Sequence, residues 1–245
     1  DNMWNIPKSL IIQKDTKKFD PTSLEARDIK IKIVQMDIPV SYAPAFEGEI
    51  IRRKQMQVEF DGSDPVQNGF ELVQTLPLAE VEDHKIELIG PDLDEFEFGS
   101  KHSIAFVVQV AGKSWQTDFE PVVERKFHNF INCLEGVMHT GQRDLIRVRV
   151  SDAAFQAGFR AKHFGEVLYA KVKSEYAGVV DKCQVKVITD EELVRQHRAD
   201  WAQAAYDKRD ERLESLTDES VDIYYTCVLC QAFSPSHVCI VTPER

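Results

Sequence analysis

Residues 102–134, HSIAFVVQVAGKSWQTDFEPVVERKFHNFINCL, contain the change of hydrophobic period that decides the fold class. The first part, from His102 to Val110, is a largely apolar run with the length of one buried strand. Pro121 suits the first turn of a helix, and Gly136 suits its end. Between them the apolar residues recur at the spacing of one helix face, at Val123, Phe127, Phe130, Ile131 and Leu134. The stretch therefore predicts a strand followed by a helix.

Short strands are predicted upstream of this stretch. Apolar and polar residues alternate over 29–33 and over 56–60, which is the period of a strand with one dry face. Further apolar runs at 70–75 and 85–89 are separated by turn residues such as Asp61-Gly62 and Gly90-Pro91-Asp92. A largely antiparallel sheet is the simplest arrangement of these strands.

Helices and strands alternate downstream. Residues 145–150 predict a strand, and Ser151-Asp152 can cap a short helix that stops at Gly158. A further helix around Phe164 to Leu168 ends before Gly178, and Val185 and Val187 mark another strand.

A long charged stretch without Gly or Pro, EELVRQHRADWAQAAYDKRDERLE, extends from about residue 190 to residue 214 and predicts a long helix. The composition changes beyond it, so we expect a middle domain over 1–189 and the start of a truncated second domain over 190–245. The predicted fold class is α+β, with an antiparallel or mixed sheet, helices packed on it, and the long helix leading into the second domain.

Charge and composition exclude several classes of protein. The chain has 30 Lys+Arg against 41 Asp+Glu and a formal net charge of -11, without a basic run, which argues against nucleic acid as a partner. No stretch approaches the ~20 apolar residues of a bilayer-spanning helix, so no membrane partner is expected. The chain has 5 cysteines, an odd number, and no Asn-x-Ser/Thr glycosylation sequence. Both features fit a reducing compartment better than secretion, so we expect the protein in the cytoplasm.

Three of the cysteines lie in the segment CVLCQAFSPSHVC, at Cys227, Cys230 and Cys239. Thiolates are soft ligands, and a Cys-x2-Cys pair followed by a third cysteine has the spacing of an iron–sulfur or zinc site. From spacing alone, zinc held by these cysteines and His237 is a competing arrangement. Packing as buried small hydrophobic residues is the alternative to any metal, and we make that assignment for Cys133 and Cys183.

A second group of candidate residues is basic. Strand alternation places Arg147 and Arg149 on one face, with Arg143 in the preceding turn. Three guanidinium groups can bind the diphosphate of an anionic ligand through paired, charge-assisted hydrogen bonds. The alternative is a solvated face paired with carboxylates such as Asp144 and Asp152. His139 lies in a neighbouring predicted turn, and we expect it to be a structural residue rather than a phosphate contact.

Four stretches resemble one family. They are CVLCQAFSPSHVCIVTPER at 227–245, VSYAPAFEGE at 40–49, DFEPVVER at 118–125 and EGVMHTGQRD at 135–144. They resemble the CO-methylating acetyl-CoA synthase, the catalytic subunit of the carbon monoxide dehydrogenase/acetyl-CoA synthase complex. The resemblance covers the chain from about residue 40 to its end, and the cysteine segment is its most specific part.

The resemblance implies a metal centre and its ligands. In that family four cysteines hold a 4Fe-4S cluster, and one of them bridges to nickel. Cys227, Cys230 and Cys239 match the first three ligands, and Cys230 matches the bridging one. The fourth ligand is expected just beyond Arg245 and a nickel-binding Cys-Gly-Cys motif further on. We therefore expect this chain to be a fragment, inactive by itself, of a longer protein. His237 is then expected to be a structural residue that supports the ligands rather than a ligand itself.

The resemblance also implies an activity and partners. The full enzyme is an acyltransferase that joins CO, a methyl group from a corrinoid iron–sulfur protein and coenzyme A into acetyl-CoA, in a complex with a carbon monoxide dehydrogenase subunit. Coenzyme A then becomes the expected ligand of Arg143, Arg147 and Arg149. The alternative hypothesis is a non-catalytic module that docks partner proteins and carries a zinc or vestigial cysteine site.

Overall fold

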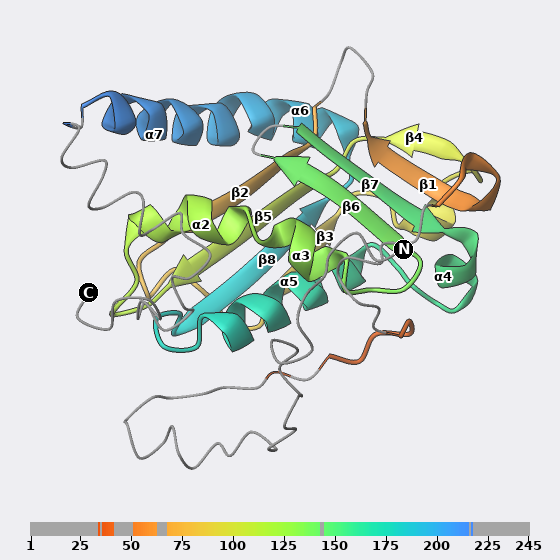
Figure 1. The fold of residues 1–245 in the computed structure, drawn as a ribbon, viewed down its shortest axis with the longest axis horizontal. Helices are drawn as coiled ribbons and strands as arrows, with labels where there is room; N and C mark the ends of the chain where they lie inside the picture. The colour runs from red at the N-terminus through yellow and green to blue at the C-terminus, as the bar shows by residue number, and fades with distance from the viewer. Residues whose placement is uncertain are drawn as a thin grey trace, which may run out of the picture. The chain divides into compact units, whose positions relative to one another are not determined.

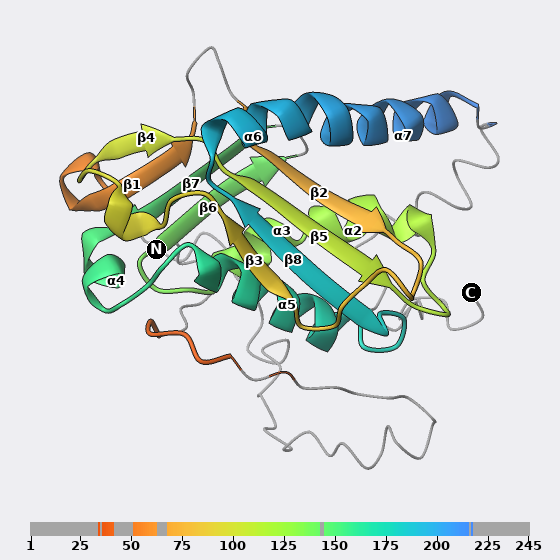
Figure 2. The same ribbon diagram turned by 180° about the vertical axis from the view of Figure 1, so that it is seen from behind.

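The strands form two separate four-stranded sheets in the computed structural model of the protein (Figures 1 and 2). The structure describes residues 34, 36–41, 51–62, 68–142, 145–215 and 217. The strands are β1 Met56–Asp61, β2 Phe70–Thr75, β3 Ile86–Ile89, β4 Ser100–His102, β5 Ala105–Ala111, β6 Val137–Gln142, β7 Leu145–Ser151 and β8 Lys182–Ile188.

The α-helices of the described residues are α2 Glu120–Glu124, α3 Phe127–Ile131, α4 Asp152–Gln156, α5 Lys162–Glu175, α6 Glu191–His197 and α7 Ala204–Glu214. Short 3-10 turns are η2 Arg53–Gln55, η3 Leu93–Glu95 and η4 Thr117–Phe119, and η5 Arg198–Gln203 is a π-helical stretch. The strands predicted at 56–60, 70–75, 85–89 and 145–150 are confirmed. The strand expected at 29–33 lies outside the described residues.

Both sheets are mixed, in the orders β4-β1-β7-β6 and β2-β5-β8-β3. Strand β1 is parallel to β4 and antiparallel to β7, while β5 is parallel to β2 and antiparallel to β8. The α+β class with a mixed sheet is confirmed, but one largely antiparallel sheet is wrong. Hydrophobic alternation shows which face of a strand is dry, whereas it does not specify the partner or its direction.

Two hydrophobic clusters cover the two faces of the β2-β5-β8-β3 sheet. On one face, Phe106 of β5 packs with Phe127 and Phe164 of α3 and α5, all fully buried. On the other face, Phe70 of β2 belongs to a smaller cluster with Tyr206 of α7 and neighbouring residues of α6 and η5. Helices therefore lie against both faces of this sheet, and α7 is close to its β2 edge (Figure 2).

The helix predicted between Pro121 and Gly136 is two short helices. After α2, the amide of Arg125 bonds back to Pro121 and that of Lys126 to Val123, so the chain turns before α3 begins at Phe127. This turn still buries all of the apolar positions that predicted the helix, including Leu134. The periodicity indicated the buried face correctly, while the break was not visible in it.

The long helix predicted from residue 190 to residue 214 is confirmed as the continuous run α6–η5–α7 (Figure 1). The Asp190 carboxylate caps its first turn by accepting from the amide of Leu193 at 2.9 Å. Gly90 makes this start possible: its φ is +112°, and a Cβ there would lie 2.3 Å from the Asp190 nitrogen. The domain boundary expected at 189/190 stays a prediction.

Among the residues described, we find no helix with both the length and the apolar content that crossing a bilayer requires.

Candidate functional site

The cysteine segment and part of the basic group lie outside the described residues. These are Cys227, Cys230, His237, Cys239 and Arg143, and their roles stay predictions. Within the described ranges, no group of three or more His, Cys, Asp and Glu side chains has the arrangement of a metal site. Cys227, Cys230 and Cys239 stay the predicted metal ligands.

The two described cysteines are packing residues, as predicted. Cys183 of β8 is completely buried, and Cys133, which follows α3, is 8% exposed. Burial raises the pKa of both thiols, so they stay protonated. The Cys133 Sγ donates to the carbonyl of Phe130 at 2.8 Å. Neither thiol has the character of a metal ligand, which must be deprotonated.

Arg147 lies on β7, opposite Asp61 of β1 and Thr140 of β6. Its side chain is partly buried, and its Nε is buried without a hydrogen-bond partner in the described part of the chain. Gly62 lies beside the guanidinium, where a Cβ would be 2.9 Å from that Nε. Its φ of +117° is also strained for other residues, so Gly62 leaves Arg147 the space that a side chain would fill.

Arg149 is engaged by a carboxylate that the sequence did not single out. Its Nε contacts Glu59 of β1, directly opposite in register, and its Nη1 donates to the carbonyl of Ile51 at 3.0 Å. Lys101 adds an ion pair to Glu59 at 3.3 Å. Burial alone raises the pKa of Glu59, but the hydrogen bonds and charges of Arg149 and Lys101 outweigh it and lower the pKa overall. The sequence signal that could have pointed to Glu59 is its polar position in the alternating strand 56–60.

His139 is in the middle of β6, so its expected position in a turn is wrong. Its side chain is fully buried and contacts the carboxylate of Glu71 on β2. The Asn132 side chain accepts from the His139 amide and donates to its carbonyl, both at 2.7 Å. A Cβ at Gly141 would lie 2.8 Å from both the Glu71 carboxylate and the imidazole. His139 is therefore a structural residue buried against Glu71, and its burial leaves no exposed face for a phosphate.

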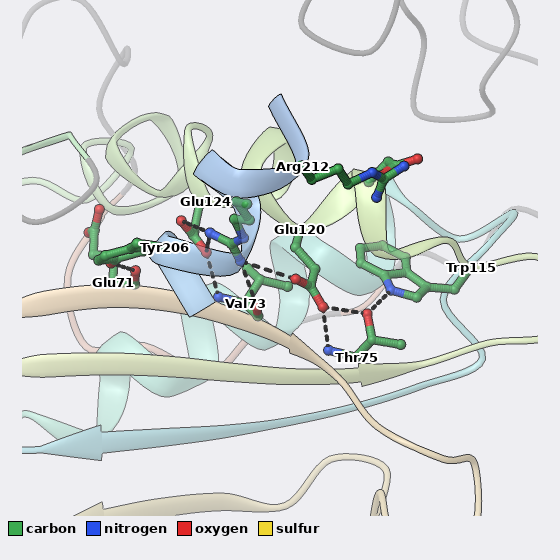
Figure 3. A network of polar contacts seen from close by, with 10 residues as sticks. Glu71, Val73, Thr75, Trp115, Glu120, Glu124, Tyr206 and Arg212 are labelled. Carbon is green, nitrogen blue, oxygen red and sulfur yellow. Dashed lines mark hydrogen bonds and ion pairs between the residues drawn. The ribbon is translucent and has the colours of Figure 1, made fainter. Parts of the chain in front are cut away.

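A second polar network covers the free edge of β2 (Figure 3). Two glutamates of α2, one helical turn apart, accept from outward-facing groups of this strand. Glu124 accepts from the Val73 amide at 2.8 Å. Glu120 accepts from the Thr75 amide at 2.8 Å and from its hydroxyl at 2.6 Å. Trp115 completes the network by donating to the same hydroxyl at 2.7 Å.

Helix α7 supplies the opposite charge. The Arg209 guanidinium donates to Glu124 at 3.0 Å, to Glu120 at 3.1 Å and to the carbonyl of Val73 at 3.1 Å. One turn earlier, the Tyr206 hydroxyl donates to the carbonyl of Glu71 at 2.6 Å. This cluster was not predicted from the sequence; glutamates spaced i, i+4 at the start of α2 are the signal that could have suggested it.

Glu124 has an unusual electrostatic environment. Burial raises its pKa to about 7, and the nearby Glu71 carboxylate contributes in the same direction. The positive charge of Arg209 and the hydrogen bond from Val73 oppose this shift without cancelling it. The cluster therefore binds a proton near neutral pH.

Comparison with known proteins gives two matches to protein families and several similar proteins. Residues 38–194 match the family described as CO dehydrogenase/acetyl-CoA synthase complex beta subunit, and residues 206–245 match the C-terminal part of the ACS/CODH beta subunit. Carbon monoxide dehydrogenase/acetyl-CoA synthase subunit alpha of Moorella thermoacetica is 46% identical over 240 residues, which cover 98% of this chain and 32% of that protein.

Two further relatives come from Methanocaldococcus jannaschii. Acetyl-CoA decarbonylase/synthase complex subunit beta 1 is 42% identical over 245 residues, 100% of this chain and 32% of that protein. Subunit beta 2 is 44% identical over 209 residues, 85% of this chain and 43% of that protein. The chain spans about a third of the length of the Moorella protein and of subunit beta 1.

The two family matches divide the chain within the long helix. The first ends in α6 at residue 194, and the second begins in α7 at residue 206. The cysteine segment lies in the second match, and the basic strand β7 lies in the first. Since the first match covers more than half of this chain, the chain belongs to the family of CO dehydrogenase/acetyl-CoA synthase complex beta subunits.

Proposed function

We propose that this chain is part of an acetyl-CoA synthase that assembles acetyl-CoA from CO, a methyl group and coenzyme A. The observation that carries the proposal is the match of residues 206–245 to the C-terminal segment of the beta subunit, because it contains Cys227, Cys230 and Cys239. The names of the relatives, which are subunits of synthase and decarbonylase complexes, support the same activity class.

The donor set fits a metal cluster. Three thiolates at C-x2-C-x8-C are soft ligands suited to iron–sulfur chemistry, and Cys230 is the residue that would also bridge to nickel. A bound nickel and 4Fe-4S centre would supply the chemistry that joins the methyl carbon to the CO carbon and the resulting acyl carbon to the sulfur of coenzyme A. The cysteines of this chain would hold that centre, and the partners would be a corrinoid iron–sulfur protein and a carbon monoxide dehydrogenase subunit, in the cytoplasm.

The basic group would bind coenzyme A. Arg147 is the strongest of the three candidates, because its Nε has no partner within the described ranges and Gly62 leaves space beside it. Arg149 is neutralised by Glu59, so its role would be to keep the β1–β7 pair in register. Arg143, which follows β6 in the sequence, would add a second guanidinium.

We expect the Arg147→Ala variant to bind coenzyme A about tenfold more weakly, because one charge-assisted contact to the diphosphate is lost. Arg149→Ala should leave the affinity within about twofold but lower the melting temperature, since it leaves Glu59 buried beside only Lys101. Calorimetric titration with coenzyme A measures both effects. Pantetheine, which lacks the diphosphate, is the control ligand, and its affinity should be the same in both variants.

Metal analysis after anaerobic reconstitution tests the proposed function against the docking-module alternative. Iron and sulfide in a brown protein support the synthase assignment. Stoichiometric zinc in a colourless protein supports the non-catalytic docking module with a zinc site. A polypeptide extended past Arg245 that takes up neither iron nor nickel would overturn the synthase proposal.

A further inference from the structure

Helix α7 lies where the second family match begins, shortly after the end of the first. It contains the first residues of the C-terminal match, yet its side chains contact residues of the other match, on α2 and β2. The next cysteine along the chain after α7 is Cys227. The place where α7 binds therefore limits where the cysteine segment can begin.

Two residues anchor α7 along the edge of β2. The Tyr206 hydroxyl and the Arg209 guanidinium donate to the outward carbonyls of Glu71 and Val73. Further along the helix, Arg212 forms an ion pair with Asp118 just before α2. The spacing of three residues places all of these contacts on one side of the helix. Their partners belong to elements far away in the sequence, so the contacts bridge the two matched segments.

We propose that Arg209 is a positioning residue that holds α7 on the β2 edge and thereby sets the point from which the chain continues toward the cysteine segment. The positioning role rests on the proposed metal-binding function of those cysteines, whereas the anchoring of α7 does not. Arg209 has 19% of its side chain exposed, against 15% for Glu120 and 8% for Glu124, so its ion pairs are largely removed from water.

The geometry of the guanidinium explains why arginine is needed. Nη1 donates to Glu124, while Nη2 is shared between Glu120 and the carbonyl of Val73. A lysine ammonium has the same charge but lacks the planar fork that reaches three acceptors in fixed directions. Without Arg209 the two glutamates would face each other across a buried site with no cation, which disfavours the docked helix.

Hydrogen exchange of the metal-free full chain tests the anchoring. In Arg209→Met, we expect protection of peptides covering 204–214 to fall at least about tenfold, while β5 and β8 keep theirs. Lys208→Met is the matched control, because Lys208 is exposed on the same helix, and its exchange should equal that of the wild type. Equal protection of α7 in the two methionine variants would overturn the anchoring.

A conservative variant covers the case in which Arg209→Met fails to fold. Arg209→Lys should fold and lose part of the α7 protection, because it retains the charge and loses the fork. Wild-type protection in Arg209→Lys would contradict the need for arginine. In the iron-loaded polypeptide extended past Arg245, iron release to a chelator should be about fivefold faster in the lysine variant than in Lys208→Met.

These measurements separate two kinds of failure. A wild-type polypeptide that takes up no iron refutes the proposed function, although the exchange result is unaffected by it. Iron uptake with equal release rates in Arg209→Lys and Lys208→Met refutes the positioning role. Unchanged α7 exchange refutes the anchoring itself, whatever the metal content.

Discussion

Replacing Cys230 by serine is expected to lower the iron bound after anaerobic reconstitution at least about tenfold, since a serine hydroxyl is a poor, hard ligand for iron–sulfur clusters. Cys230 is the second cysteine of the Cys-x2-Cys pair and the proposed ligand for which the resemblance implies a bridge to nickel. Its loss should therefore reduce nickel content as well as iron. Elemental analysis of the polypeptide extended past Arg245 measures both metals.

Cys133→Ser is the matched control for this experiment. Cys133 is buried and its thiol pKa is raised, so serine there should change stability slightly and leave iron content at the wild-type level. Retention of full iron by Cys230→Ser would remove this cysteine from the ligand set. A parallel loss of iron in Cys133→Ser would instead indicate that both variants act through misfolding.

Glu124→Gln is expected to become more stable relative to the wild type as the pH rises. The pKa of Glu124 is raised to about 7 in the folded protein, from its ordinary value of 4.5. The protonated form therefore stabilises the fold fully below pH 4.5, and this contribution is lost as the pH rises towards 7. Glutamine resembles the protonated carboxyl and does not ionise. The difference in unfolding free energy between variant and wild type should grow by roughly 2–3 kcal/mol from pH 5 to pH 8.

Chemical denaturation at the two pH values measures this difference. The charged groups around Glu124 are Arg209 of α7, Glu120 of α2 and Glu71 of β2, and all are retained in the variant. Glu211→Gln, on the exposed side of α7, is the control and should show no pH-dependent difference. A constant difference between Glu124→Gln and the wild type at both pH values would show that Glu124 is ionised throughout this range.

Local signals predicted most of the elements. The strand predicted over 56–60 and the Ser151 cap of α4 each depend on residues close in sequence, and each is present in the structure, although β1 is buried on both faces. The pairing of β2 with β5 in parallel and the division into two sheets depend on distant residues. One chain's hydrophobic pattern does not contain that information.

In the candidate site, too, residue types could be predicted from local sequence, whereas their partners could not. The three arginines were identified by type and spacing, but the assignment of Arg149 to Glu59 required the register of β1 against β7. Likewise, Glu120 and Glu124 could be recognised as an i, i+4 pair, whereas Arg209 is about ninety residues away along the chain. Buried ion pairs between distant elements are fixed by tertiary packing and have no local sequence signal.

The side chains along β2 are expected to hinder self-association through this strand. Four outward backbone groups of this strand, the carbonyls of Glu71 and Val73 and the amides of Val73 and Thr75, are already bonded to side chains. An open strand edge can recruit a strand from another molecule and start aggregation. A polypeptide cut before Ala204 would expose two of these carbonyls, so we expect it to form oligomers through β2 that light scattering detects and that the intact chain does not form.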